Sequence, residues 1–240
     1  MDNIVEHYIN KNFINNFNYF LYAFIFYLPI IDLLQNYVTT EFSIKHSKII
    51  KLISIVWDLS LTIFSFFGSY YIFLYIYNII KNDGFNATIH VPKDNQILDW
   101  IYYFIVSKVF EMLDTVLLVM KNKKVIFLHW YHHLVTFVLA YYSIVTKSEI
   151  AIWYCFINYI IHTIMYGYYF LVNFIKINNP SWITILQTMQ MFYAIFLIFY
   201  SYIFLNKKFD HFAFGVYLVF AIYFIKYFID RYNKPKNLKK

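Results

Sequence analysis

The pattern of hydrophobic and polar positions along the chain is dominated by long apolar runs. A transmembrane helix needs about 20 predominantly apolar residues, and seven stretches of this sequence qualify. Short polar segments separate them, including the basic turn KNKK between the third and the fourth. The sequence therefore predicts an all-α integral membrane protein with seven transmembrane helices, over residues 17–38, 49–79, 98–120, 125–145, 150–174, 182–205 and 212–229.

The composition supports a single membrane domain. The chain is 61% hydrophobic and 14% charged, and four glycines and four prolines in 240 residues leave no room for a low-complexity linker. We therefore expect one transmembrane domain over residues 1–240, ending in a short basic tail at 231–240. The single cysteine says nothing about the redox compartment. The N-terminus lacks a basic region before a short apolar core, so the first helix is not expected to be a cleaved signal.

Basic residues are distributed unevenly between the two sides that seven spans would create. One side would hold twelve of the lysine and arginine residues and the other six. Because positively charged loops tend to remain in the cytoplasm, we expect a cytosolic C-terminus and a lumenal N-terminus. The glycosylation sequon at Asn86 would then face the lumen. The net charge of +7 requires no nucleic acid, since basic cytosolic edges suit anionic lipid headgroups or an anionic substrate.

Polar side chains within the expected spans recur at helical spacing. Such residues cost a few kcal/mol at the centre of a membrane unless they face protein or water. Four helices carry them, and with alternating helix directions all four sets reach the cytosolic half of the bilayer. The sequence thus predicts one polar chamber there. The sets are Lys108, Glu111, Asp114 and Thr115; His129, His132 and His133; Asn158, His162, Met165, Tyr166 and Tyr169; and Thr184, Gln187 and Gln190.

These residues form four motifs, KVFEMLDT, HWYHH, NYIIHTIMYGYY and TILQTMQ, over roughly residues 108–190. In this order the motifs resemble those of the ELO family of very-long-chain fatty acid elongases. Outside this block the resemblance rests on length and hydropathy. There are two departures. Asp58 stands where the family usually has an asparagine, and the tail KPKNLKK lacks the usual dilysine spacing.

The resemblance implies a 3-oxoacyl-CoA synthase of the endoplasmic reticulum. Such an enzyme condenses a long acyl-CoA with malonyl-CoA, releasing carbon dioxide and CoA, on a path that supplies sphingolipid precursors. It implies an apolar acyl tunnel beyond the polar chamber, no bound cofactor and no metal. The implied partners are acyl-CoA and malonyl-CoA, membrane lipids, and the ketoacyl reductase, dehydratase and enoyl reductase of the elongation cycle. A homodimer is compatible with the sequence.

Histidine chemistry fits this activity. A neutral imidazole in a water-poor site keeps a nucleophilic lone pair, which attacks a thioester and holds the acyl group as an acyl-imidazole. The resemblance places the nucleophile at His132, with His162 as its catalytic neighbour and His129 and His133 orienting it or handling protons. The enolate formed by decarboxylation needs hydrogen-bond donors. The candidate donors are His162, Asn158, Gln187 and Tyr166.

The other polar residues are expected to support this chemistry. Lys108, Glu111 and Asp114 would form a buried charged network that holds the helices in register or supports the histidines. Near the cytosolic mouth, a basic turn either binds CoA phosphates or only sets the topology. The supporting set is completed by Thr115, Asn158, Tyr166, Gln187 and Gln190, and the basic turn contains Lys121, Lys123 and Lys124.

Two other function classes stay open at this point. A di-iron membrane desaturase or hydroxylase also uses HxxHH boxes, with neutral imidazoles as iron ligands. Such sites need about eight histidines in several boxes, whereas four of the eight histidines here lie in termini or loops. A non-enzymatic seven-helix transporter would also bury polar residues, near the midplane. Against it, the chain shows no clear internal repeat and the helices lack glycine and proline breaks.

Overall fold

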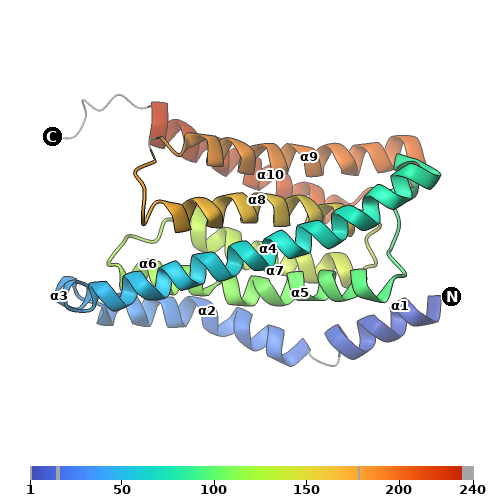
Figure 1. Cartoon of the computed structure of the whole chain (residues 1–240). Coiled ribbons are helices and arrows are strands. Elements are labelled where there is room, and N and C mark those ends of the chain that lie inside the picture. The colour runs from blue at the N-terminus through green and yellow to red at the C-terminus, as the bar shows by residue number, and fades with distance from the viewer. Residues whose placement is uncertain (1, 15–16, 178, 234–240) are drawn as a thin grey trace.

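The computed structural model describes residues 2–14, 17–177 and 179–233. Within these residues the protein is all-helical, without a β-strand. The long helices run side by side in a bundle, with α9 and α10 along one edge and α2 along the opposite edge (Figure 1). The part of the expected basic tail from residue 234 onward lies outside the described residues.

The helices follow one another in the order α1 (Asp2–Ile9), η1 (Asn10–Ile14), α2 (Phe17–Tyr37), α3 (Thr40–Lys45), α4 (Ser47–Asp83), η2 (Phe85–Thr88), α5 (Asn95–Glu111), α6 (Leu113–Met120), α7 (Phe127–Val145), α8 (Ala151–Leu171), α9 (Ser181–Leu205), α10 (His211–Phe228) and η3 (Ile229–Asn233). The N-terminus and α3 lie at opposite ends of the bundle (Figure 1).

Local sequence signals explain several helix boundaries. Asp94 precedes α5, and its side chain accepts hydrogen bonds from the backbone N–H groups two and three residues later. Asp210 caps α10 in the same way. Helix α4 ends at Asp83 and is followed by Gly84, whose φ of +83° is a conformation that other residues rarely adopt. These caps lie at the edges of the apolar runs, where the hydropathy pattern places the helix ends.

Six of the seven expected helices are present as single helices, with ends within four residues of the prediction: α2, α4, α7, α8, α9 and α10. The third is different, because residues 98–120 divide into α5 and α6 at Met112. The backbone N–H of Met112 bonds the carbonyl of Val109, and the N–H of Thr115 bonds the carbonyl of Met112. These three-residue hydrogen bonds tighten the helix locally. No proline or glycine marks the break, so the apolar run gives no sign of it.

Four helices in the described part of the chain are long and apolar enough to cross a membrane, judged by length and composition. They are Phe17–Tyr37, Ser47–Asp83, Ser181–Leu205 and His211–Tyr232. Polar residues interrupt the apolar character of α7 and α8, while α5 and α6 have only 17 and 8 residues. The chain is a membrane protein, and α5 to α8 are not among these four helices.

The longest helix, α4, packs closely against α8. The ring of Tyr159 on α8 is 2% exposed and lies against Gly68 on α4. A Cβ atom at Gly68 would lie 2.6 Å from Cζ of that ring, far inside van der Waals contact. The Tyr159 hydroxyl donates to the carbonyl oxygen of Trp100 on α5, at 3.0 Å. Glycine at this position therefore allows α4, α5 and α8 to meet, which fixes the helices that carry the polar motifs.

Candidate active site

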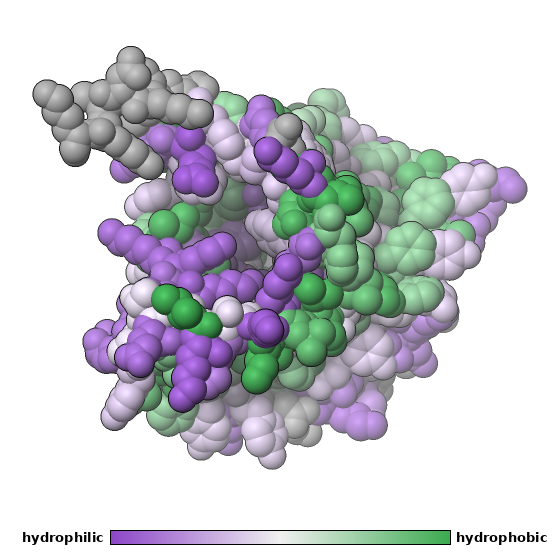
Figure 2. Space-filling model, turned by 60° about the vertical axis from the view of Figure 1, so that its left-hand side comes forward, coloured by the Kyte–Doolittle hydropathy of each residue, from purple (hydrophilic) through white to green (hydrophobic). Residues whose placement is uncertain are grey.

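A cavity of about 450 Å³ opens at the end of the bundle where α6 turns into α7. Figure 2 shows this end of the molecule, with hydrophilic residues around a hollow. We call it the main cavity. Its polar lining consists mainly of Asp58, Asp114, Lys121, Lys123, His129, His132, His133, His162, Tyr166 and Gln187.

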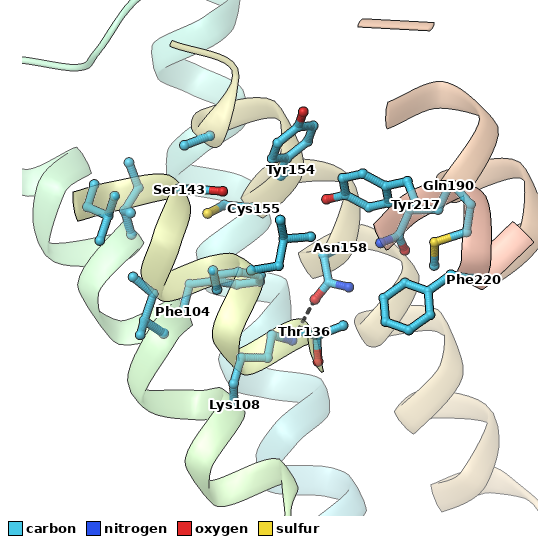
Figure 3. Close-up of a pocket in the computed structure, with 17 residues that line it drawn as sticks. Phe104, Lys108, Thr136, Ser143, Tyr154, Cys155, Asn158, Gln190, Tyr217 and Phe220 are labelled. Atoms are coloured by element: carbon cyan, nitrogen blue, oxygen red, sulfur yellow. Dashed lines mark hydrogen bonds between the residues drawn. The ribbon is translucent and has the colours of Figure 1, made fainter. Parts of the chain in front are cut away.

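A second cavity, of about 40 Å³, begins one turn beyond His132 on α7, and we call it the slot. Near its start lie Lys108, Thr136 and Asn158 (Figure 3). Most of its remaining lining is apolar, from α5, α7, α8, α9 and α10. Phe220 lines the slot, and its ring centroid lies 5.1 Å from that of His132. The two cavities thus approach one another at His132.

The three histidines of α7 differ in their surroundings. Nε2 of His129 lies 3.0 Å from Oγ1 of Thr115 on α6. His133 is buried, with its ring 4.6 Å from that of His129. The imidazole of His132 is only partly buried and forms no hydrogen bond with any residue that the structure describes, while its ring packs on Phe220 and Phe224. The His133 imidazole also has no hydrogen bond with a described residue, but it is buried, so His132 is the more open of these two imidazoles to the cavity.

His162 on α8 belongs to a buried charged network. Its Nδ1 lies 3.5 Å from Oε1 of Glu111, which also receives hydrogen bonds from Lys108 Nζ at 2.9 Å and from Ser107 Oγ at 3.1 Å. Lys108 donates further to Oδ1 of Asn158, at 2.7 Å. Lys108 and Glu111 are 2% and 3% exposed, so the lysine and the carboxylate compensate each other away from solvent. This network connects α5 to α8 directly behind the histidines.

Asp114 is held apart from that network. Its two carboxylate oxygens accept hydrogen bonds from Trp57 Nε1 at 2.6 Å and from the Tyr166 hydroxyl at 2.5 Å. Asp114 lines the main cavity, whereas Lys108 lies at the slot. The spacing of Lys108, Glu111, Asp114 and Thr115 predicts that they share one helical face. The break at Met112 separates α6 from α5, so the first two residues lie on α5 and the last two on α6. Lys108 consequently lines the slot and Asp114 the main cavity.

The polar face of α9 is divided in the same manner. Gln187 lines the main cavity and donates to the sulfur of Met165 at 3.2 Å. Gln190, three residues later, is buried and lines the slot. The sequence predicts one chamber that collects all four polar faces. The main cavity is lined by residues of all four sets, among them Asp114, His132, His162 and Gln187. Lys108, Asn158 and Gln190 line the slot instead, because residues one turn apart on a helix lie at different depths.

Only part of the basic turn contributes to the lining of the main cavity, at its mouth. Lys121 and Lys123 line it, whereas Lys124 is exposed and lies outside its lining. Burial lowers the pKa of the Lys121 ammonium, and the nearby Asp58 carboxylate opposes that shift. Asp58, the residue at which the chain departs from the family pattern, thus faces Lys121 across the entrance.

Two residues at the site carry no sequence signal of their own. The Tyr27 hydroxyl on α2 lies 2.6 Å from Oγ1 of Thr115, and Trp57 on α4 holds Asp114. Both lie in apolar runs, and Tyr27 is one of 26 tyrosines in the chain. Only the tertiary contacts, across 88 and 57 residues of sequence, bring them to the site.

The described residues contain no group of three or more histidine, cysteine, aspartate or glutamate side chains arranged to hold a metal ion. His129 lies within hydrogen-bond distance of Thr115. His162 lies against Glu111, whose negative charge Lys108 compensates.

Known proteins with similar sequences are fatty acid elongases. "Very long chain fatty acid elongase 4" of Trypanosoma cruzi is 35% identical over 157 residues, which cover 61% of this chain and 54% of that protein. "Fatty acid elongase 3" of Trypanosoma brucei brucei is 33% identical over 181 residues, covering 62% and 60%. Human "Very long chain fatty acid elongase 3" is 29% identical over 229 residues, covering 88% and 81%.

The chain spans little more than half the length of the trypanosomal relatives that it matches. No solved structure matches it. The model of the family described as "ELO: GNS1/SUR4 family" matches residues 12–240, which include every motif at the two cavities. The chain belongs to the ELO (GNS1/SUR4) family.

Proposed function

We propose that the chain is a fatty acid elongase that condenses a long-chain acyl-CoA with malonyl-CoA to give 3-oxoacyl-CoA, carbon dioxide and CoA. The observation that carries the proposal is His132, an imidazole without a hydrogen-bond partner among the described residues, between a polar cavity and a mostly apolar slot. The names of the relatives support the same reaction class.

In the first half-reaction, a nitrogen lone pair of His132 attacks the thioester carbon of acyl-CoA. The carbon–sulfur bond breaks, the proton of the imidazole passes to the CoA thiolate, and an acyl-imidazole remains. The acyl chain lies in the slot while CoA leaves through the main cavity. The imidazole packs on the rings of Phe220 and Phe224 and forms no hydrogen bond with a described residue, which leaves its lone pair available for this attack.

In the second half-reaction, malonyl-CoA loses carbon dioxide and the electron pair of the broken bond forms an enolate. Its carbon attacks the acyl carbonyl, the carbon–nitrogen bond breaks, and the leaving imidazole of His132 takes up a proton from the solvent. The enolate oxygen needs donors in the main cavity. His162, Gln187 and Tyr166 line that cavity and are the proposed donors, whereas Asn158 lies at the slot and is bound to Lys108.

The remaining site residues position this machinery. Lys108 and Glu111 hold His162, Thr115 holds His129, and Asp114 fixes Tyr166. His133 packs between the other two imidazoles of α7. Gln190 lines the slot beside Asn158. Lys121 and Lys123 at the mouth, with Lys124 beside them, are proposed to receive the phosphates of CoA.

We place the enzyme in the endoplasmic reticulum membrane with seven spans, a lumenal N-terminus and a cytosolic C-terminus. Helices α5 to α8 would add three spans to the four apolar helices, with α5 and α6 acting as one. The main cavity then faces the cytosol, where both CoA thioesters are found. The ketoacyl reductase, dehydratase and enoyl reductase would complete the cycle, and the chain itself needs no bound cofactor.

The test uses purified full-length protein, a panel of acyl-CoAs and labelled malonyl-CoA. Wild type is expected to form labelled 3-oxoacyl product, and His132→Ala to lose it. The exposed His211 provides a matched control, because His211→Ala should retain activity. With acyl-CoA alone, intact mass spectrometry should detect acylated wild type and unmodified His132→Ala. Normal product formation by a folded His132→Ala protein would defeat the assignment of the nucleophile.

A further inference from the structure

The lining of the slot follows one face of each of two antiparallel helices. On α7 the slot is lined by Thr136, Leu139, Ala140 and Ser143, which continue the face of His132 at spacings of three and four. On α8, Asn158, Cys155, Tyr154 and Ala151 continue the face of His162 in the same way. The slot therefore leads away from the two histidines along both helices.

Both helices give the same distance from the histidines to the far end of the slot. Ser143 lies eleven residues beyond His132, and Ala151 lies eleven residues before His162. At a rise of about 1.5 Å per residue, each path is about 16 Å long. An extended acyl chain advances about 1.3 Å per carbon, because C–C bonds of about 1.5 Å form a zigzag. An acyl chain of about twelve carbons attached to His132 thus reaches the far end.

The far end of the slot is not purely apolar. Ser143 and Tyr154 lie there, away from Lys108 and Thr136 (Figure 3). They are 4% and 8% exposed, and neither Ser143 Oγ nor the Tyr154 hydroxyl has a hydrogen-bond partner in the described part of the chain. Of the buried side-chain atoms described, only His90 Nδ1 shares this property. Buried polar atoms are nearly always paired, so two unpaired hydroxyls at the end of one slot need an explanation.

A hydrocarbon chain cannot supply a hydrogen-bond partner for these hydroxyls. A terminal methyl group has no lone pair and no polar hydrogen, so it would leave both hydroxyls unpaired. A terminal hydroxyl both donates and accepts, so it can pair with either side-chain hydroxyl that it reaches. Neither hydroxyl lies near the reacting atoms, so the condensation itself does not occupy them.

Building on the elongase activity proposed above, we propose that Ser143 and Tyr154 form a subsite for an oxygenated chain end, so that the enzyme accepts ω-hydroxyacyl-CoA of about twelve carbons beside the plain acyl-CoA. Condensation at His132 is unchanged, since the hydroxyl binds at the opposite end of the chain. The subsite determines which chain end is tolerated.

The experiment compares dodecanoyl-CoA with its ω-hydroxy analogue. In wild type, the kcat/KM ratio of hydroxy to plain substrate is expected at or above one. In Ser143→Ala/Tyr154→Phe the ratio should fall about tenfold, whatever the change in kcat/KM for the plain substrate. Ser54→Ala is the matched control, because that buried hydroxyl is bonded to the carbonyl of Ile50 on α4, and its ratio should stay at the wild-type value. A wild-type ratio far below one, unaffected by the double substitution, would overturn the subsite. That is also the result expected if water alone satisfies the hydroxyls.

A binding measurement separates this inference from the elongase activity. The free acids, dodecanoic and ω-hydroxydodecanoic, are added to detergent-solubilised protein and the Tm is followed. The hydroxy acid should stabilise wild type more than the plain acid does, and the difference should vanish in the double variant. Equal stabilisation by the two acids would reject the subsite even in an active enzyme. Absence of condensation with either thioester would instead reject the elongase activity and leave the binding result to decide the subsite.

Discussion

Nε2 of His129 and Oγ1 of Thr115 lie 3.0 Å apart, and the same oxygen lies 2.6 Å from the hydroxyl of Tyr27. The Thr115 hydroxyl has one hydrogen and two lone pairs, so it donates at most one of these two bonds. Where it donates to Nε2, the proton of the neutral His129 imidazole sits on Nδ1. The orientation of the first histidine in the motif is therefore linked, through Thr115, to a tyrosine on α2.

We expect Thr115→Val to lower kcat about tenfold with little change in KM, because His129 loses the partner that orients it. Thr115→Ser retains the hydroxyl and should recover most of the activity. The pH profile of kcat separates positioning from general destabilisation, since only a change at His129 should shift it. A variant with lower Tm but an unshifted profile and normal kcat would show that this hydrogen bond is only structural.

Removing one member of the Lys108–Glu111 pair should be more harmful than removing both. Lys108→Met leaves the buried Glu111 carboxylate without its cation and should destabilise the protein by about 3–5 kcal/mol. Lys108→Met/Glu111→Leu removes both charges and should recover most of that loss. Unfolding in detergent measures both. If the double variant were less stable than either single variant, the pair would be net stabilising.

The contact between Gly68 and Tyr159 predicts contrasting effects of two glycine substitutions. Gly68→Ala places a methyl group against the Tyr159 ring and should cost about 1–3 kcal/mol. Gly215 on α10 is the matched control, because a Cβ there meets nothing within 4 Å. Gly215→Ala should be neutral or stabilising by up to about 1 kcal/mol, owing to the higher helix propensity of alanine. Equal Tm values for the two variants would mean that α4 moves freely relative to α8.

Asp58 should weaken the binding of anionic substrate at the cavity mouth. Asp58→Asn removes the carboxylate that faces Lys121 and should lower KM for malonyl-CoA roughly threefold to fivefold, with kcat unchanged. The effect should shrink at high salt, because partly exposed charges are screened. Lys121→Met tests the pairing, since Asp58→Asn added to it should have a smaller effect than in wild type. Additive changes in KM would show that the two residues act independently.

The break at Met112 illustrates the limit of prediction from the apolar pattern. The pattern predicts six helices to within four residues of their ends, and α5 with α6 as one further helix. The tightened turn depends on two backbone hydrogen bonds in a segment without proline or glycine. Hydropathy reports which residues avoid water, and it does not distinguish a continuous helix from a broken one.

The sequence by itself determined the membrane character, the helices and the polar residues on each helical face, because these depend on neighbours within one or two turns. It also identified the family through motifs whose spacing is helical. Only the tertiary structure decided which imidazoles have a partner, which polar residues line each of the two cavities, and that Tyr27 and Trp57 reach the site. Those features depend on contacts between helices far apart in sequence, and no local pattern specifies which side chain a neighbouring helix presents.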